Sequence, residues 1–167
     1  MAWPWPRFGQ FILTKRYTAI LLALFIFFIF FLPPLSAFSE TEEISIIVNS
    51  SNPTQKATIT ELKELFLKEK TLWPHGEAVI PLDLDTSIPA RNVFLQKIVQ
   101  LSPAEYDDYW IKKKHTDGYY PPQTITTERM MVRMVGKFKG GIGFVSTKAL
   151  ISGGAVPPEV KVIATVK

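Results

Sequence analysis

The chain has 167 residues and no cysteine, which allows one ordinary domain with a targeting segment and excludes a disulfide scaffold, a thiolate metal site and a thiol nucleophile. Its net charge of +4 is unevenly placed, because three of the nineteen Lys and Arg residues, but none of the fifteen Asp and Glu residues, precede residue 38. Residues 38–167 therefore carry a net charge of only +1. No basic stripe remains to indicate nucleic-acid binding.

The N-terminal segment has the pattern of an export signal. Residues 19–32 contain no polar side chain, basic residues precede them, and Pro33 and Pro34 end the run. This order is typical of a signal peptide, which we predict over residues 1–37, followed by an α/β domain over residues 38–167. The run is shorter than the roughly 20 apolar residues of a spanning helix. The prediction is a periplasmic protein; the alternative is an uncleaved anchor over residues 19–32 that holds the domain on the periplasmic side of the inner membrane.

Strand and helix patterns alternate along the predicted domain. The predicted strands cover residues 44–48, 78–84, 142–145 and 161–166, and the predicted helices cover residues 59–68, 89–100, 103–114 and 127–135. Capping boxes mark two helix starts, at Thr58 with Glu61 and at Ser102 with Glu105. The alternation indicates an α/β fold with a mostly parallel sheet flanked by helices.

The turn after the second predicted strand is the best candidate for a ligand site. Ligands of open α/β sheets bind beyond the carboxyl ends of the strands, and a helix start there offers N–H groups and positive potential. Thr86 and Ser87 can donate from their hydroxyls, and Arg91 can hold two oxygens of an oxyanion. The alternative is a simple helix cap with a solvated arginine, and Pro89 removes one N–H donor.

Several segments, in order, resemble phosphate-type periplasmic substrate-binding proteins. They are residues 58–67 with 72–76, residues 80–91 with Phe94, residues 109–110, residues 118–122 and residues 139–145. The resemblance covers roughly residues 44–149 and implies a single lobe of a type 2 periplasmic-binding protein, with no enzymatic activity and no cofactor. It implies that Asp85, Thr86, Ser87 and Arg91 bind phosphate or a related oxyanion, in phosphate uptake or sensing with an ABC permease.

Two departures from that family pattern qualify the expected function. The binding turn of the family is rich in glycine, whereas residues 85–89 read Asp-Thr-Ser-Ile-Pro, and the first lobe of the family has no counterpart here. We therefore expect weak oxyanion binding, or binding completed by a second chain. The alternative is an envelope protein-protein interaction domain that has lost its ligand.

Other candidate residues carry weaker signals. His75 and His115 lack the spacing of metal ligands, so no metal is predicted. Asp83 and Asp85 share a face if both lie on a strand, but no companion motif supports acid/base hydrolysis of a phosphoester. Residues 106–120 contain more aromatic side chains than a core needs. Some of them are expected in the core and some could form an exposed surface for a protein partner; they are Tyr106, Tyr109, Trp110, Tyr119 and Tyr120.

Overall fold

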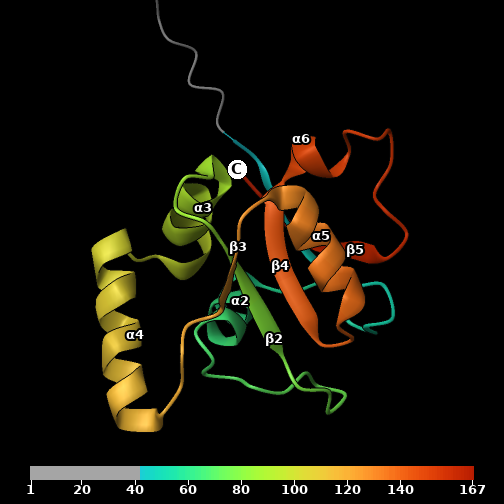
Figure 1. The fold of residues 1–167 in the computed structure, drawn as a ribbon. Coiled ribbons are helices and arrows are strands. Elements are labelled where there is room, and N and C mark those ends of the chain that lie inside the picture. The colour runs from blue at the N-terminus through green and yellow to red at the C-terminus, as the bar shows by residue number, and fades with distance from the viewer. Residues whose placement is uncertain (1–41) are drawn as a thin grey trace, which may run out of the picture. The chain divides into compact units, whose positions relative to one another are not determined.

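A five-stranded sheet organises residues 42–167, the part of the chain that this computed structural model describes (Figure 1). The strands are β1 (Ile44–Asn49), β2 (Ile80–Leu84), β3 (Gln123–Ile125), β4 (Gly141–Ser146) and β5 (Val160–Val166), in the spatial order β3-β2-β4-β1-β5. The predicted signal peptide over residues 1–37, and the alternative anchor within it, lie outside the described residues.

The sheet is mixed because one strand, β1, runs against the other four. Strand β2 pairs in parallel with β3 and β4, whereas β1 runs antiparallel to β4 and β5. Four strands therefore share one direction and β1 runs the other way, so two of the four pairings are parallel and the α/β sheet flanked by helices is mixed rather than mostly parallel. The carboxyl ends of β2, β3 and β4 consequently meet at one edge of the sheet, which is the edge that carries the predicted turn.

The helices largely follow the sequence patterns. They are α2 (Ile59–Phe66), α3 (Pro89–Phe94), the π-helical turn η1 (Leu95–Val99), α4 (Pro103–Asp117), α5 (Glu128–Lys137) and α6 (Thr147–Leu150). Both predicted capping boxes are confirmed, at Thr58 and Ser102. The predicted helix over residues 89–100 is correct in extent, but it changes from α to π geometry after Phe94 and ends where Gln100 takes a positive φ of 60°.

The two faces of the sheet are covered by different helices. Helix α5 packs against β4 at Gly143, where a Cβ atom would overlap the side chain of Met131 and force it to move. The next residue of β4, Phe144, points to the opposite face and stacks on Phe94 of α3, with ring centroids 3.9 Å apart. Phe66 of α2 meets Phe94 edge to face at 4.6 Å. This aromatic core fixes α3 above the end of β2.

Gly140 joins the segment before β2 to the start of β4. Its carbonyl oxygen accepts hydrogen bonds from the indole N–H of Trp73 at 3.1 Å and the backbone N–H of Ile80 at 2.9 Å. A Cβ atom at Gly140 would overlap the carbonyl oxygen of Ala78. The two chain segments can therefore approach this closely only because residue 140 has no side chain.

We expect Gly140→Ala to lower the free energy of unfolding by about 3 kcal/mol or more, because backbone rather than a flexible side chain must move. The matched control is Gly153→Ala, since a Cβ atom there meets nothing within 4 Å and the change should stay within about 0.5 kcal/mol. Urea denaturation of both variants measures the difference. Equal stability of the two would show that the β2–β4 junction has room to relax.

Candidate functional site

The predicted turn lies beyond the end of β2, and its polar groups largely bond to one another. The Asp85 carboxylate accepts from the Ser87 N–H at 3.0 Å and from the Ser87 hydroxyl at 2.7 Å. The backbone N–H groups of Ile88 and Arg91 also donate inside the turn. Thr86 is exposed at the tip of the turn. The turn is thus ordered by its own hydrogen bonds, and its remaining donors are chiefly side chains.

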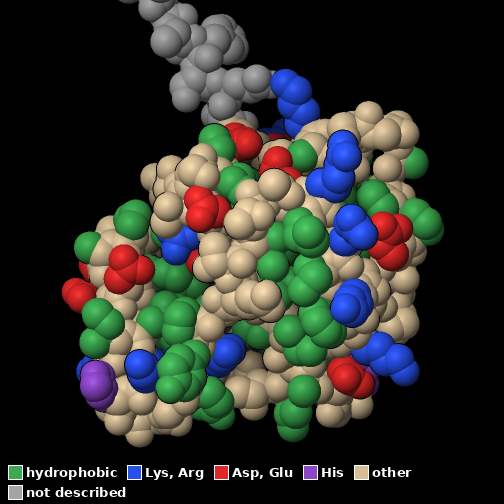
Figure 2. Space-filling view, in the orientation of Figure 1, with side chains coloured by type: hydrophobic (Ala, Val, Ile, Leu, Met, Phe, Trp, Pro, Cys, Tyr) green, Lys and Arg blue, Asp and Glu red, His purple; other side chains and the backbone are tan. Residues whose placement is uncertain are grey.

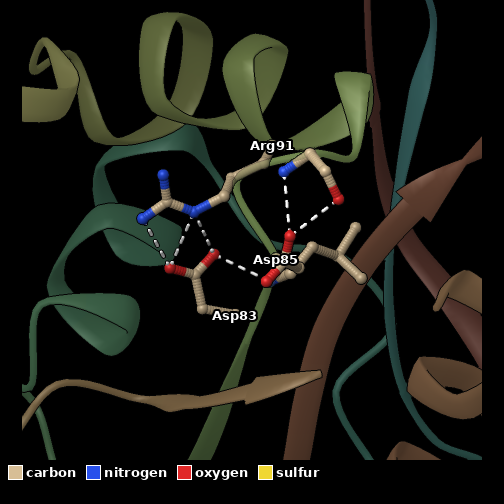
Figure 3. Close-up of polar contacts among 5 residues, drawn as sticks. Asp83, Asp85 and Arg91 are labelled. Carbon is tan, nitrogen blue, oxygen red and sulfur yellow. Dashed lines mark hydrogen bonds and ion pairs between the residues drawn. The ribbon is translucent and has the colours of Figure 1, made fainter. Parts of the chain in front are cut away.

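Arg91 points inward from α3 and forms a buried ion pair with Asp83 of β2 (Figure 3). The guanidinium donates from Nε and Nη2 to the carboxylate, with both bonds to Oδ2 at 3.1 Å. The other carboxylate oxygen accepts from the N–H of Leu84 at 2.8 Å. Arg91 was predicted at the site from the sequence, but its pairing with Asp83 was not. The two aspartates therefore have separate partners, Arg91 for Asp83 and Ser87 for Asp85.

Burial and hydrogen bonding shift the two carboxyl groups in opposite directions. Desolvation raises the pKa of Asp83, and the nearby positive charge of Arg91 only partly opposes that rise. Hydrogen bonds from Ser87 lower the pKa of the half-buried Asp85. Of the two, Asp83 is therefore the carboxyl group that depends on a nearby cation to offset the cost of its burial.

A depression of about 540 Å³ adjoins the ion pair, between α4 and the β2–β3 edge of the sheet. Thr86, Asp83 and Arg91 line one end of it, whereas Asp85 and Ser87 do not reach it. The other wall comes from α4 and from residues 120–124. The structure therefore brings two of the four predicted site residues, Thr86 and Arg91, together at one cavity.

The remaining candidates separate into buried and exposed groups. Tyr106 and Trp110 are buried, Tyr109 is half-buried, and Tyr119 and Tyr120 are exposed, so the dense aromatic region is partly core and partly surface. His75 and His115 are both exposed. Within residues 42–167 there is no cluster of side chains suited to hold a metal ion, and no helix of this part is long and apolar enough to cross a membrane.

The five-stranded mixed sheet, the helices on its faces and the turn at the carboxyl end of β2 give residues 42–167 an α/β fold of one compact lobe. Solved structures of phosphate transport proteins share this fold over nearly three quarters of the chain. No protein-family model and no curated protein matches the sequence. The predicted fold class is therefore confirmed through structure, at a sequence identity too low to carry more than the fold.

Three of these structures illustrate the likeness. An ABC-type phosphate transport receptor from Vibrio cholerae is 20% identical, with a TM-score of 0.54 over 73% of this chain and 45% of its own. A protein from Clostridium perfringens, assigned as a phosphate ABC transporter substrate-binding protein and solved with bound phosphate, is 17% identical, with a TM-score of 0.56 over 73% and 44%. PstS from Borrelia burgdorferi is 8% identical, with a TM-score of 0.56 over 74% and 47%. The chain thus spans less than half the length of the structures it matches.

We expect Arg91→Met to lower the free energy of unfolding by about 3–5 kcal/mol near neutral pH, because it leaves the Asp83 carboxylate buried without its cation. The loss should shrink as the pH falls. Without Arg91 the raised pKa of Asp83 rises further, so the folded variant takes up a proton that the unfolded chain does not hold, and its stability relative to wild type decreases as the pH increases.

Urea denaturation between pH 5 and pH 8 measures this dependence. Asp107→Asn is the control, since Asp107 lines the same depression but is exposed, and its substitution should change stability by less than about 0.5 kcal/mol. A loss in Arg91→Met that stays constant across this range would show that Asp83 is not the source of the cost.

Proposed function

We propose that the chain is an exported solute-binding module that binds phosphate or a related oxyanion weakly at the turn between β2 and α3. The observation that carries the proposal is the meeting of Thr86 and Arg91 at the depression beside the end of β2. The fold adds support, because the neighbours that share it are substrate-binding proteins of phosphate transporters rather than enzymes.

Each proposed site residue has a distinct role. Among the described residues the Nη1 group of Arg91 has no acceptor, so it can donate to an oxyanion while Nε and Nη2 stay on Asp83. Thr86 contributes its exposed hydroxyl. Ser87 and Asp85 lie outside the depression, so they act on an anion that extends from it over the turn. Ser87 then donates its hydroxyl to the anion in place of Asp85 Oδ1, and Asp85 Oδ2 accepts the hydrogen of hydrogen phosphate.

Weak binding follows from the same contacts. Arg91 shares its charge with Asp83, and the Asp85 carboxylate repels an approaching anion. A single lobe also supplies donors from one side only. A partner that supplies further donors would therefore strengthen binding, and we propose an ABC permease in the inner membrane for this role. We place the domain in the periplasm, with residues 19–32 as its membrane anchor when the signal is not cleaved.

One observation favours a second function, an envelope protein-protein interaction domain that has lost its ligand. Arg91 and Ser87, the two strongest donors, already have carboxylate acceptors within the protein. Recovery of the same envelope protein with and without added phosphate, together with no anion binding, would favour this second function over the first.

Calorimetry on the full-length chain tests oxyanion binding directly. We expect a dissociation constant for phosphate above the micromolar range, and Thr86→Val should weaken binding up to about tenfold by removing one donor to a charged group. Thr165→Val is the matched control, because Thr165 is equally exposed but lies on β5. Absence of heat for phosphate and sulfate at millimolar concentration would end the ligand-binding proposal.

We also expect Asp85→Asn to reduce the preference for phosphate over sulfate. Sulfate carries no hydrogen near neutral pH, so the Asp85 carboxylate only repels it, whereas hydrogen phosphate can donate to that carboxylate. The lowered pKa of Asp85 keeps this group ionised throughout the range of the measurement. Competition calorimetry with the two anions gives the ratio, and an unchanged ratio would show that Asp85 does not face the ligand.

A further inference from the structure

Buried polar atoms without partners gather at the depression beside the ion pair. Within residues 42–167 three buried side-chain polar atoms have no hydrogen-bond partner, and two of them belong to residues that line this one cavity. They are the hydroxyl of Tyr106 and the indole N–H of Trp110, whose side chains are 2% and 4% exposed. Burial raises the pKa of the Tyr106 hydroxyl and the nearby Trp110 indole partly opposes that rise, so the two groups act chiefly on each other and form the buried floor of the cavity.

The polar groups around the cavity are mainly hydrogen-bond donors. Thr86 can donate its exposed hydroxyl, and Arg91 can donate from Nη1 above the ring of Tyr106, whose centroid lies 5.5 Å from the guanidinium carbon. Lys114 and Thr124 line the outer part. Such a set requires a ligand rich in acceptor oxygens. It does not favour a cation, because Asp83, one of the two carboxylates that line the cavity, is already paired with Arg91.

The other wall of the cavity is apolar and is held in place. Ile111, Tyr120 and Pro122 line it, and Tyr120 is 61% exposed. Lys68 donates to the carbonyl oxygen of Tyr120 at 2.9 Å, and Lys114 lies 5.0 Å from the Tyr120 ring centroid. In Figure 2 hydrophobic side chains gather between α4 and the β3 segment, with basic side chains at their border. The cavity thus combines a donor-rich end with an aromatic side.

We propose that this cavity binds an organic phosphomonoester, with the phosphoryl oxygens at Arg91 and Thr86 and the organic group against Tyr120 and Pro122. The inference rests on the proposed oxyanion function and extends it from an inorganic anion to an ester. The volume of about 540 Å³ exceeds the needs of phosphate alone and suits a small organic ligand. Lys114 and Asp107, which both line the cavity, carry opposite charges, so donor geometry and apolar contact, rather than net charge, select the ligand.

Calorimetry with inorganic phosphate, phenyl phosphate and benzyl alcohol on the full-length chain tests the inference. Phenyl phosphate should bind about tenfold more tightly than phosphate, because its ring buries apolar surface that phosphate lacks. Tyr120→Ala should remove that advantage and leave phosphate binding unchanged. Tyr119→Ala is the matched control, since Tyr119 is an exposed neighbour that does not line the cavity. A change in tryptophan fluorescence that Trp110→Phe abolishes would place the ring beside α4.

The outcomes separate this inference from the proposed function. Binding of phosphate with no gain for phenyl phosphate, or equal losses in the two tyrosine variants, would overturn the phosphomonoester site and leave the oxyanion module in place. Binding of benzyl alcohol as tight as that of phenyl phosphate would also overturn it, because the donors would then contribute nothing. Failure of both phosphate and phenyl phosphate to bind would remove the proposed function itself.

Discussion

The buried ion pair between Asp83 and Arg91 is the constraint on which the site depends. A carboxylate taken out of water needs a cation and hydrogen bonds, and here it receives bonds from Nε and Nη2 of Arg91 and from the N–H of Leu84. The pair joins the last residues of β2 to the first turn of α3, across the bend that holds Thr86. It also aims the remaining face of the guanidinium at the cavity beside α4. Any ligand must therefore bind without breaking this pair.

Local signals predicted most of the fold, and tertiary contacts account for what they missed. The two capping boxes need only residues three positions apart, so Thr58 and Ser102 marked their helices correctly. Strand β3 has three residues, of which only Ile125 is buried, and so short a pattern carries no periodicity. At the site, Arg91 was predicted from its place after the turn. Its pairing with Asp83 was not, because only the packed structure shows that both side chains are buried.

Helix α4 supplies from the same chain the wall that an isolated lobe otherwise lacks. The chain spans less than half the length of its structural neighbours, so no second lobe within residues 42–167 can cover the edge of β2. Tyr109 anchors α4 by donating to the carbonyl oxygen of Leu67 at 2.9 Å, and Tyr106 packs beneath Arg91. These contacts place the aromatic face of α4 opposite the guanidinium. A helix in this position can shield a ligand from water on one side, which strengthens each hydrogen bond the ligand makes.

The hydrogen bonds inside the turn and the shape of the cavity together motivate the proposal that a ligand with an organic group binds better than an inorganic anion. An oxyanion that binds only at the turn must displace Asp85 from Ser87, exchanging one charge-assisted hydrogen bond for another with little net gain. An oxyanion that enters the cavity instead meets the Nη1 group of Arg91, which has no acceptor among the described residues. Apolar contact with Tyr120 and Pro122 adds to that gain without any competing internal bond. In the proposed binding mode, affinity therefore depends on the cavity wall on α4 more than on the turn that follows β2.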